Sequence, residues 1–136
     1  MNNWTKQDSP TRYSRTSKSR LNSCHDDIKR LFIELAKDGY DISIVCGTRN
    51  KKAQNIAFNF GFSGCKWPDS NHNSYPSLAV DAAPHIAGVG IPWKDENLWV
   101  IFAGVVLAKA QELNIDIEWG GFYKINDLNH FQLAAD

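Results

Sequence analysis

The sequence has no excess of charge of either sign. Its 136 residues carry 15 basic and 15 acidic side chains, and the formal net charge is +0 at pH 7. Because a protein that binds nucleic acid usually has a basic surface, the balanced charge argues against nucleic acid as the main partner. The sequence also lacks an apolar run long enough to span a bilayer, so no stable membrane insertion is expected.

Cysteine is scarce, and its positions do not form a metal-binding pattern. Cys24, Cys46 and Cys65 are an odd number without C-x-x-C spacing, so a thiolate zinc site is not expected. We expect all three to be small, mostly buried and reduced. Cys65 lies close in sequence to His72, so a Cys–His nucleophile pair is an alternative, although such a pair alone has low specificity.

The N-terminal residues lack the apolar segment of a secretory signal, so we expect the protein to stay in the cytoplasm until something releases it. Residues 1–22 are rich in Ser, Thr, Lys and Arg and show no clear hydrophobic period, which predicts a flexible basic arm. The arm is expected to be a solvated tail, and weak attraction to an anionic cell wall or membrane face is the alternative. Residues 23–136 are then the folded domain.

The sequence does contain enough apolar residues, 43%, for the core of one domain, and it shows no internal repeat or linker. The predicted elements do not alternate as βαβ units, which indicates a single α+β domain with a small antiparallel sheet packed by helices. Hydrophobic periodicity predicts helices over 23–37, 51–60 and 96–113, and strands over 42–46, 78–83, 115–119 and 130–133. In the second helix the predicted inward residues are Ala53, Ile56, Ala57 and Phe60.

The stretch from Ser70 to Asp81 holds a histidine and an aspartate separated by a short loop. Asp81 sits in the apolar run of residues 78–83, which predicts a buried strand. A carboxylate there is costly unless something pairs with it, and a metal ion is one such partner. Near the C-terminus, His130 lies beside a second apolar strand. Together with His72, these residues form a three-ligand set that suits catalytic zinc and leaves one position for water.

Two further residues are candidates for catalysis. Asp127 precedes His130 in a D-x-x-H pattern, which can place its carboxylate beside the metal without ligating it, as a general base. Arg49 follows the predicted strand over 42–46, where it can hold a carboxylate or an oxyanion, or form only a surface salt bridge. His85 is a weaker ligand candidate. On spacing alone, histidines satisfied within the core remain the more common explanation.

Four segments carry a family resemblance. They are Cys46-Gly47-Thr48-Arg49, Ser70-x-His72 leading to Pro76-Ser77-x-Ala79-Val80-Asp81, Trp119-Gly120-Gly121, and Asp127-x-x-His130-Phe131-Gln132-Leu133. In this order they resemble the zinc D-Ala-D-Ala carboxypeptidase and L-alanyl-D-glutamate endopeptidase family, whose fold is shared with the hedgehog signalling domain. The small phage endolysins of that family are the most similar group, and the resemblance covers roughly residues 21–133.

The resemblance implies Zn²⁺ held by His72, Asp81 and His130, with Asp127 as catalytic base and Arg49 as a contact to substrate or oxyanion. Residues 23–136 would then be the zinc peptidase domain. The implied substrate is the stem peptide of bacterial peptidoglycan, cut at the L-alanyl-D-glutamate bond or a close neighbour during bacteriophage lysis. A monomer is expected, held in the host cytoplasm until a holin releases it to the periplasm and cell wall.

The chain departs from many relatives after Trp119-Gly120-Gly121, where Phe122-Tyr123 replaces Asp-Trp, and this leaves the substrate preference open. One alternative is a D-Ala-D-Ala carboxypeptidase, and another is a non-catalytic zinc-containing binding domain on the same fold. The intact D-x-x-H pattern argues against the binding domain, because a pure binder needs no base beside the metal. A cysteine hydrolase that uses Cys65 is a weaker alternative.

Overall fold

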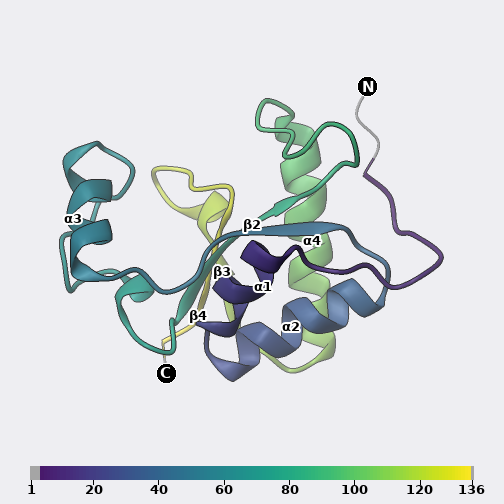
Figure 1. The fold of residues 1–136 in the computed structure, drawn as a ribbon, viewed down its shortest axis with the longest axis horizontal. Helices are drawn as coiled ribbons and strands as arrows, with labels where there is room; N and C mark the ends of the chain where they lie inside the picture. Colours follow the sequence, from purple (N-terminus) through teal and green to yellow (C-terminus); the bar gives the residue numbers. More distant parts are fainter. Residues whose placement is uncertain (1–3, 136) are drawn as a thin grey trace.

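A four-stranded antiparallel sheet in the order β1-β2-β4-β3 runs through the middle of the molecule (Figure 1). This computed structural model describes residues 4–135. The strands are β1 (Ile42–Cys46), β2 (Ala79–Pro84), β3 (Ile117–Trp119) and β4 (His130–Leu133). The sheet confirms the predicted α+β class, and β4 has the predicted bounds.

The α-helices within residues 4–135 are α1 (Arg15–Asn22), α2 (Asp26–Lys37), α3 (Lys51–Asn59) and α4 (Glu96–Glu112). Helix α2 begins later than predicted, because the ring of His25 caps it by accepting from the amide of Asp27. Helices α2 and α4 pack on each other, and α4 also packs on β2 and β3. Within residues 4–135, no helix is both long and apolar enough to cross a membrane.

The core and the polar site lie on opposite faces of β2. Successive side chains of a strand point to opposite faces of its sheet. Val80 and Ala82 are fully buried in the core, where they join Phe32 of α2 and Phe102 of α4. Asp81 lies between them and is the one residue of β2 that is not fully buried. The alternation therefore turns the Asp81 carboxylate away from the core.

The N-terminal segment is not the flexible arm predicted from its composition. Residues 15–22 form α1, whose first turn is capped by the Ser14 hydroxyl. Helix α1 packs on β1, where the Ser17 hydroxyl accepts from the amide of Ile44 at 2.9 Å. This bond satisfies a backbone donor on the edge strand of the sheet, which would otherwise remain unpaired.

Trp4 anchors the same segment further upstream. Its indole is 8% exposed, stacks on Tyr40 and meets Phe102 edge to face, and its Nε1 donates to the carbonyl of Asp41 at 2.7 Å. A single buried apolar residue in a polar segment produces no hydrophobic periodicity, so the burial of Trp4 could not be predicted from the sequence. The division of the chain at residue 22 is therefore wrong for residues 4–22, and residues 1–3 lie outside the described residues.

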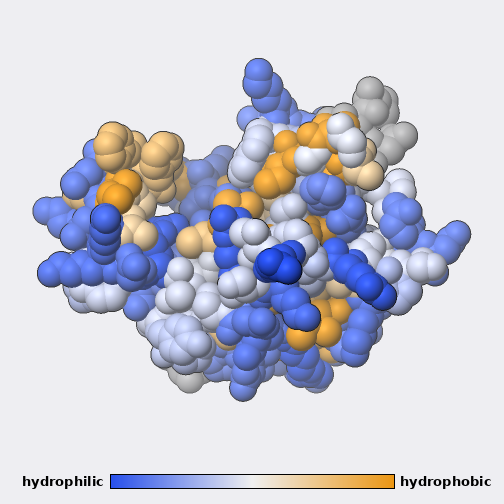
Figure 2. Space-filling model, in the orientation of Figure 1, coloured by the Kyte–Doolittle hydropathy of each residue, from blue (hydrophilic) through white to orange (hydrophobic). Residues whose placement is uncertain are grey.

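Helix α3 lies where it was predicted, but its inward face is different. Ile56 is 47% exposed and Phe60 72% exposed, whereas Gln54 is completely buried. Helix α3 projects from the side of the molecule (Figure 1), and hydrophobic residues gather on the surface over it (Figure 2). Its buried side therefore faces polar loop residues and not the hydrophobic core, which reverses the usual meaning of an amphipathic pattern.

Candidate metal and catalytic site

Three neighbouring strands place one polar residue each in a row across the sheet. Cys46 of β1 is paired with Asp81 of β2, and Asp81 is paired with His130 of β4. A bulge between Ile44 and Cys46 produces this register, because regular pairing would set Val45 opposite Asp81. Directly paired residues project to the same face, so the three side chains lie next to one another.

His72 reaches the row from the loop before β2. It lies in the short 3-10 helix η1 (Asn71–Asn73), where the Ser70 and Asn73 side chains form a capping box. The imidazole is 3% exposed, its Nδ1 is 2.7 Å from the carbonyl oxygen of Gly47, and its Nε2 is 3.2 Å from Oδ1 of Asp81. Because a carbonyl can only accept, Nδ1 carries the hydrogen in the neutral ring, and the lone pair of Nε2 faces Asp81.

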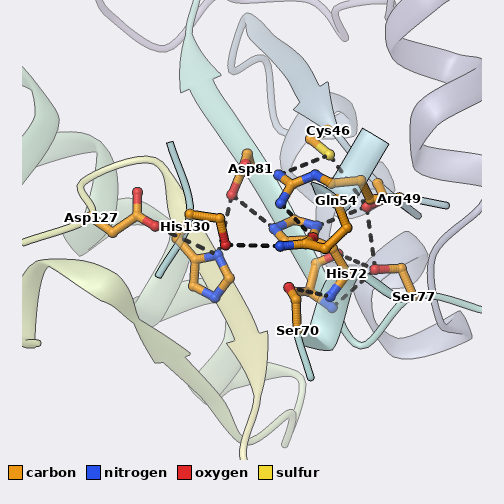
Figure 3. A network of polar contacts seen from close by, with 12 residues as sticks. Cys46, Arg49, Gln54, Ser70, His72, Ser77, Asp81, Asp127 and His130 are labelled. Carbon is orange, nitrogen blue, oxygen red and sulfur yellow. Dashed lines mark hydrogen bonds and ion pairs between the residues drawn. The ribbon is translucent and has the colours of Figure 1, made fainter. Parts of the chain in front are cut away.

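His130 offers its other ring nitrogen to the same oxygen. Its Nδ1 is 3.2 Å from Oδ1 of Asp81, and its Nε2 is 2.8 Å from Oε1 of Gln132. In the neutral ring Nε2 donates to the amide oxygen, which leaves the lone pair of Nδ1 free. Figure 3 shows the side chains of His72, Asp81 and His130 pointing toward one another.

These three residues fit a zinc ion. Zinc–nitrogen and zinc–oxygen bonds of about 2.0–2.2 Å in tetrahedral geometry separate neighbouring donor atoms by roughly 3.3 Å. The two histidine nitrogens are each 3.2 Å from Oδ1 of Asp81. The Gly47 carbonyl and the Gln132 amide hold the rings from behind, as outer-shell partners of metal-binding histidines do. The structure therefore brings the three predicted ligands together around Oδ1 of Asp81. The residues whose ligand atoms all lie within 4.8 Å of one another are Cys46, His72 and Asp81, so the ring of His130 would have to shift toward His72 to complete a tetrahedral site.

The site strongly favours positive charge. Burial raises the pKa of Asp81, but hydrogen bonds and charges from His130 and His72 outweigh burial and hold it well below its usual range. Burial lowers the pKa of His72, but hydrogen bonds to Asp81 and Cys46 outweigh burial and raise it to about 10. In the metal-free protein, a proton on His72 thus neutralises a charge that a metal ion could neutralise instead.

Arg49 lies on one side of this cluster and is not a simple surface residue. Its Nη2 is 3.7 Å from Oδ2 of Asp81, and its side chain is 16% exposed. Nη1 donates to Oε1 of Gln54 at 2.9 Å, while the backbone amide of Arg49 donates to the carbonyl of His72 at 2.6 Å. These bonds hold the guanidinium at the edge of the site.

Gln54 is a site residue that the sequence analysis missed. Its Nε2 donates to the hydroxyl of Ser63 at 2.9 Å and to the carbonyl of Cys65 at 2.7 Å, and its Oε1 also accepts from Asn73. Gln54 therefore links α3, the following loop and η1 to the guanidinium of Arg49. The only signal in the sequence is its position five residues after Arg49, at the start of a predicted helix.

Asp127 lies on the other side of the cluster (Figure 3). Its Oδ2 is 4.0 Å from Nδ1 of His130, and its side chain is 53% exposed. The carbonyl of Gly120 accepts from the Asp127 amide, and a Cβ atom added to Gly120 would clash with the Asp127 carbonyl. Burial and the charge of Asp81 raise the pKa of Asp127, and the charges of His130, His72 and Arg49 oppose this shift.

Cys46 is also part of the cluster, although no thiol was expected there. Ligand atoms of Cys46, His72 and Asp81 all lie within 4.8 Å of one another. Burial raises the pKa of the Cys46 thiol, but a hydrogen bond to His72 and the charges of His72 and Arg49 outweigh burial and lower it. Sequence spacing could not reveal this proximity, because it depends on strand pairing and on the bulge.

The other cysteines and the extra histidine lie elsewhere. Cys24 is buried, but Cys65 is exposed, so the expectation that all three thiols are mostly buried is wrong for Cys65. Among the described residues, no hydrogen bond joins the Cys65 thiol to His72, whose ring nitrogens face Gly47 and Asp81. His85 pairs with Asp41 at 3.0 Å and does not join the cluster.

Residues after β3 form the edge of the site next to His130. Phe122 is 77% exposed and contacts the Trp119 ring edge to face. The ring of Tyr123 lies 6.0 Å from that of His130, measured between centroids. Of the two residues that depart from the family pattern, Tyr123 therefore lies next to the cluster, and Phe122 packs on Trp119.

The chain is similar to known peptidases in sequence and in fold. A sequence profile of the family described as phage L-alanyl-D-glutamate peptidase matches residues 10–133. The L-Ala D-Glu endopeptidase ChiX of Serratia marcescens is 28% identical in sequence, with 90% of each chain covered and a TM-score of 0.74. No curated protein sequence matches the chain at a significant level.

Proposed function

Because this chain belongs to the phage L-alanyl-D-glutamate peptidase family, we propose that it cuts the stem peptide of peptidoglycan between L-alanine and D-glutamate, using a bound zinc ion. The observation that carries the proposal is the convergence of two histidine nitrogens on one carboxylate oxygen of Asp81, each at 3.2 Å. Arg49 and Asp127 flank this point on opposite sides (Figure 3).

The proposed ligands are Nε2 of His72, Oδ1 of Asp81 and Nδ1 of His130. A bound zinc ion acts as a Lewis acid toward the scissile carbonyl and lowers the pKa of water. The Gly47 carbonyl and the Gln132 amide keep the two imidazoles in the required tautomers. The negative charge of Asp81 supplies the electrostatic attraction for the cation.

Asp127 is the proposed general base. Its carboxylate would take a proton from the attacking water while the water oxygen bonds to the L-alanyl carbonyl carbon, and would then give this proton to the D-glutamyl nitrogen as the C–N bond breaks. Its half-exposed side chain at 4.0 Å from His130 supports this role, because it leaves room for water and substrate. The raised pKa also suits a group that must accept and release a proton near neutral pH.

Arg49 is proposed to bind a carboxylate of the stem peptide or the oxyanion that forms during attack. A guanidinium can meet a carboxylate with two parallel hydrogen bonds. Gln54 holds one nitrogen of the group, and the side chain remains partly open to the site. The rigid support means that Arg49 does not need to be ordered by the substrate itself.

We propose that the protein acts on the cell wall of the phage host after its release from the cytoplasm, as a monomer. The family match supports the cell wall as the place of action. Tyr123 lies beside His130 and would contact the peptide on that side, next to the exposed ring of Phe122.

The test is digestion of purified Gram-negative peptidoglycan, with and without a zinc chelator, followed by mass spectrometry of the products. Chelator-sensitive release of peptides that begin with D-glutamate is the expected result. Free D-alanine as the sole product would assign the protein to the carboxypeptidase branch instead. Bound zinc and binding to the sacculus without any product would indicate a non-catalytic binding domain.

A further inference from the structure

We propose that the Cys46 thiolate is a fourth protein ligand of the metal ion held by His72, Asp81 and His130. This inference rests on the proposed zinc site and adds a residue to it. It gives a role to a thiol that the proposed peptidase chemistry does not use.

The register of the sheet places the thiol of Cys46 beside the proposed ligands. Cys46, Asp81 and His130 are directly paired across β1, β2 and β4, so their side chains leave the same face of the sheet in one row. The bulge in β1 replaces Val45 with Cys46 at the end of that row. A sulfur atom therefore stands beside the Asp81 carboxylate, where regular pairing would have placed a valine.

The distances between the donor atoms support the same assignment. A thiol sulfur, an imidazole nitrogen and a carboxylate oxygen of Cys46, His72 and Asp81 lie within 4.8 Å of one another. Zinc–sulfur bonds of about 2.3 Å with zinc–nitrogen bonds of about 2.0 Å would separate sulfur and nitrogen by roughly 3.5 Å in a tetrahedral site. Donor atoms at the 4.8 Å limit would have to approach each other by roughly 1 Å to reach this separation.

The orientation of the thiol supports the assignment as well. Nη2 of Arg49 donates to Sγ of Cys46 at 3.5 Å, and the same nitrogen is 3.7 Å from Oδ2 of Asp81. The guanidinium thus faces both the sulfur and the carboxylate at the edge of the site (Figure 3). Sγ of Cys46 also lies 3.5 Å from the carbonyl of Gly47. Sγ of Cys24 faces the carbonyls of Arg20 and Ala79, and no side chain of the cluster is among its hydrogen-bond partners within the described residues.

A fourth ligand has a consequence for the metal. Catalytic zinc sites usually have three protein ligands, and zinc can expand to five ligands, so a sulfur ligand is compatible with turnover. With Cys46 as a fourth ligand, the site would bind the metal more tightly than the three-ligand set alone. We expect Cys46→Ser to weaken zinc binding by about tenfold or more, since even outer-shell changes cost roughly 10–100-fold in metal affinity.

Cobalt(II) substitution provides the direct test. The purified full chain is titrated with cobalt(II), and the near-ultraviolet absorption is examined for the charge-transfer band of a thiolate–cobalt bond. The band is expected in the wild type and in Cys65→Ser, and it should be missing from Cys46→Ser. Cys65→Ser is the matched control because Cys65 is an exposed thiol outside the cluster.

Zinc affinity and alkylation provide independent readouts. Competition with a chromophoric chelator should show weaker zinc binding for Cys46→Ser only, with circular dichroism to compare the fold.

If that variant does not fold, alkylation of the wild type decides, because bound zinc should slow labelling of Cys46 and leave Cys65 unaffected. A cobalt complex without the thiolate band, or equal labelling with and without zinc, would overturn the inference while leaving the proposed peptidase intact. Absence of metal binding in the wild type would overturn both.

Discussion

His72 and His130 direct different ring nitrogens toward the same oxygen of Asp81, because a different group bonds the other nitrogen of each ring. The Gly47 carbonyl engages Nδ1 of His72, while the Gln132 amide oxygen engages Nε2 of His130. The remaining lone pairs converge at Asp81, which is why two histidines far apart in sequence act as one set. Replacing either backing group should loosen the set without removing a ligand.

Asp127 should be required for turnover but not for metal binding. We expect Asp127→Asn to lower kcat by about 10²–10⁴-fold, the usual contribution of a general base, because the amide cannot accept the proton. Zinc content, measured by atomic absorption, should stay stoichiometric because Asp127 lies outside the ligand set. Asp116→Asn is the control, since Asp116 is also exposed and its carbonyl accepts from the amide of Ala134, at the opposite end of β4 from His130. Full activity of Asp127→Asn would exclude the assigned role.

Gln54 should act through Arg49. Gln54→Leu removes the partner of the guanidinium and leaves buried polar groups without hydrogen bonds, which costs roughly 1–3 kcal/mol per unsatisfied group. We expect a lower melting temperature, together with a KM that rises more than kcat falls if Arg49 binds the substrate carboxylate. Gln111→Leu, at an exposed position of α4, should change neither quantity. Unaltered kinetics in a folded Gln54→Leu protein would contradict the positioning role.

Zinc binding should release protons. The pKa of His72 is about 10 in the metal-free protein, so its imidazole is protonated at pH 7, whereas zinc requires the neutral ring. Zinc affinity should therefore rise with pH and approach a plateau as pH passes this pKa. Calorimetry at pH 7 in buffers of different ionisation enthalpy should give at least roughly one proton released per zinc ion. A binding enthalpy that is the same in every buffer would contradict this expectation.

The strands and turns show where close backbone approach is needed. The short helix η2 (Gly120–Phe122) follows β3, and Gly120 allows the backbone of the Asp127 segment to approach it. Similarly, a Cβ atom at Gly47 would clash with the Arg20 carbonyl at the end of α1. The glycines of the two sequence motifs thus allow neighbouring segments to approach closely, and the carbonyl of Gly47 also contacts the ring of His72.

Gly120→Ala should therefore disturb both stability and catalysis. The added methyl group collides with backbone, which cannot move as freely as a side chain, so we expect a loss of about 1–3 kcal/mol in unfolding free energy. Because the collision displaces the Asp127 segment, kcat should fall as well. Gly104→Ala is a strict control, since nothing lies within 4 Å of its added Cβ and Gly104 is inside α4. That substitution should stabilise the helix by roughly 0.5–1 kcal/mol in denaturant unfolding.

The positions of the strands and of α2, α3 and α4 were largely predictable because they depend on local hydrophobic periodicity, whereas α1 was missed. The bounds of β4 and the start of α4 follow directly from such patterns. The places of Cys46 and Gln54 in the site were not predictable. Cys46 reaches the site through the register of β1, and Gln54 reaches it because α3 packs its polar side inward. The ligands His72, Asp81 and His130 came mainly from family resemblance, and spacing alone did not separate them from core histidines.

The N-terminal segment, which the sequence pattern predicted to be a solvated arm, packs on several parts of the molecule. Trp4 contacts Tyr40 and Phe102, so the start of the described chain, the turn after α2 and the helix α4 meet at one indole. Helix α1 covers β1, the strand that ends at Cys46. The N-terminal segment therefore packs against the strand that carries Cys46.

Trp4→Ala should show how much the N-terminal segment contributes. The indole is 8% exposed, and truncating a buried aromatic side chain costs about 3–5 kcal/mol in unfolding free energy. Loss of the bond from Nε1 to the Asp41 carbonyl adds to this cost. Trp93→Ala is the matched control, because Trp93 is 58% exposed although it also stacks on another tryptophan. Urea unfolding of both variants measures the difference, and a Trp4→Ala protein as stable as Trp93→Ala would mean that the segment is an arm after all.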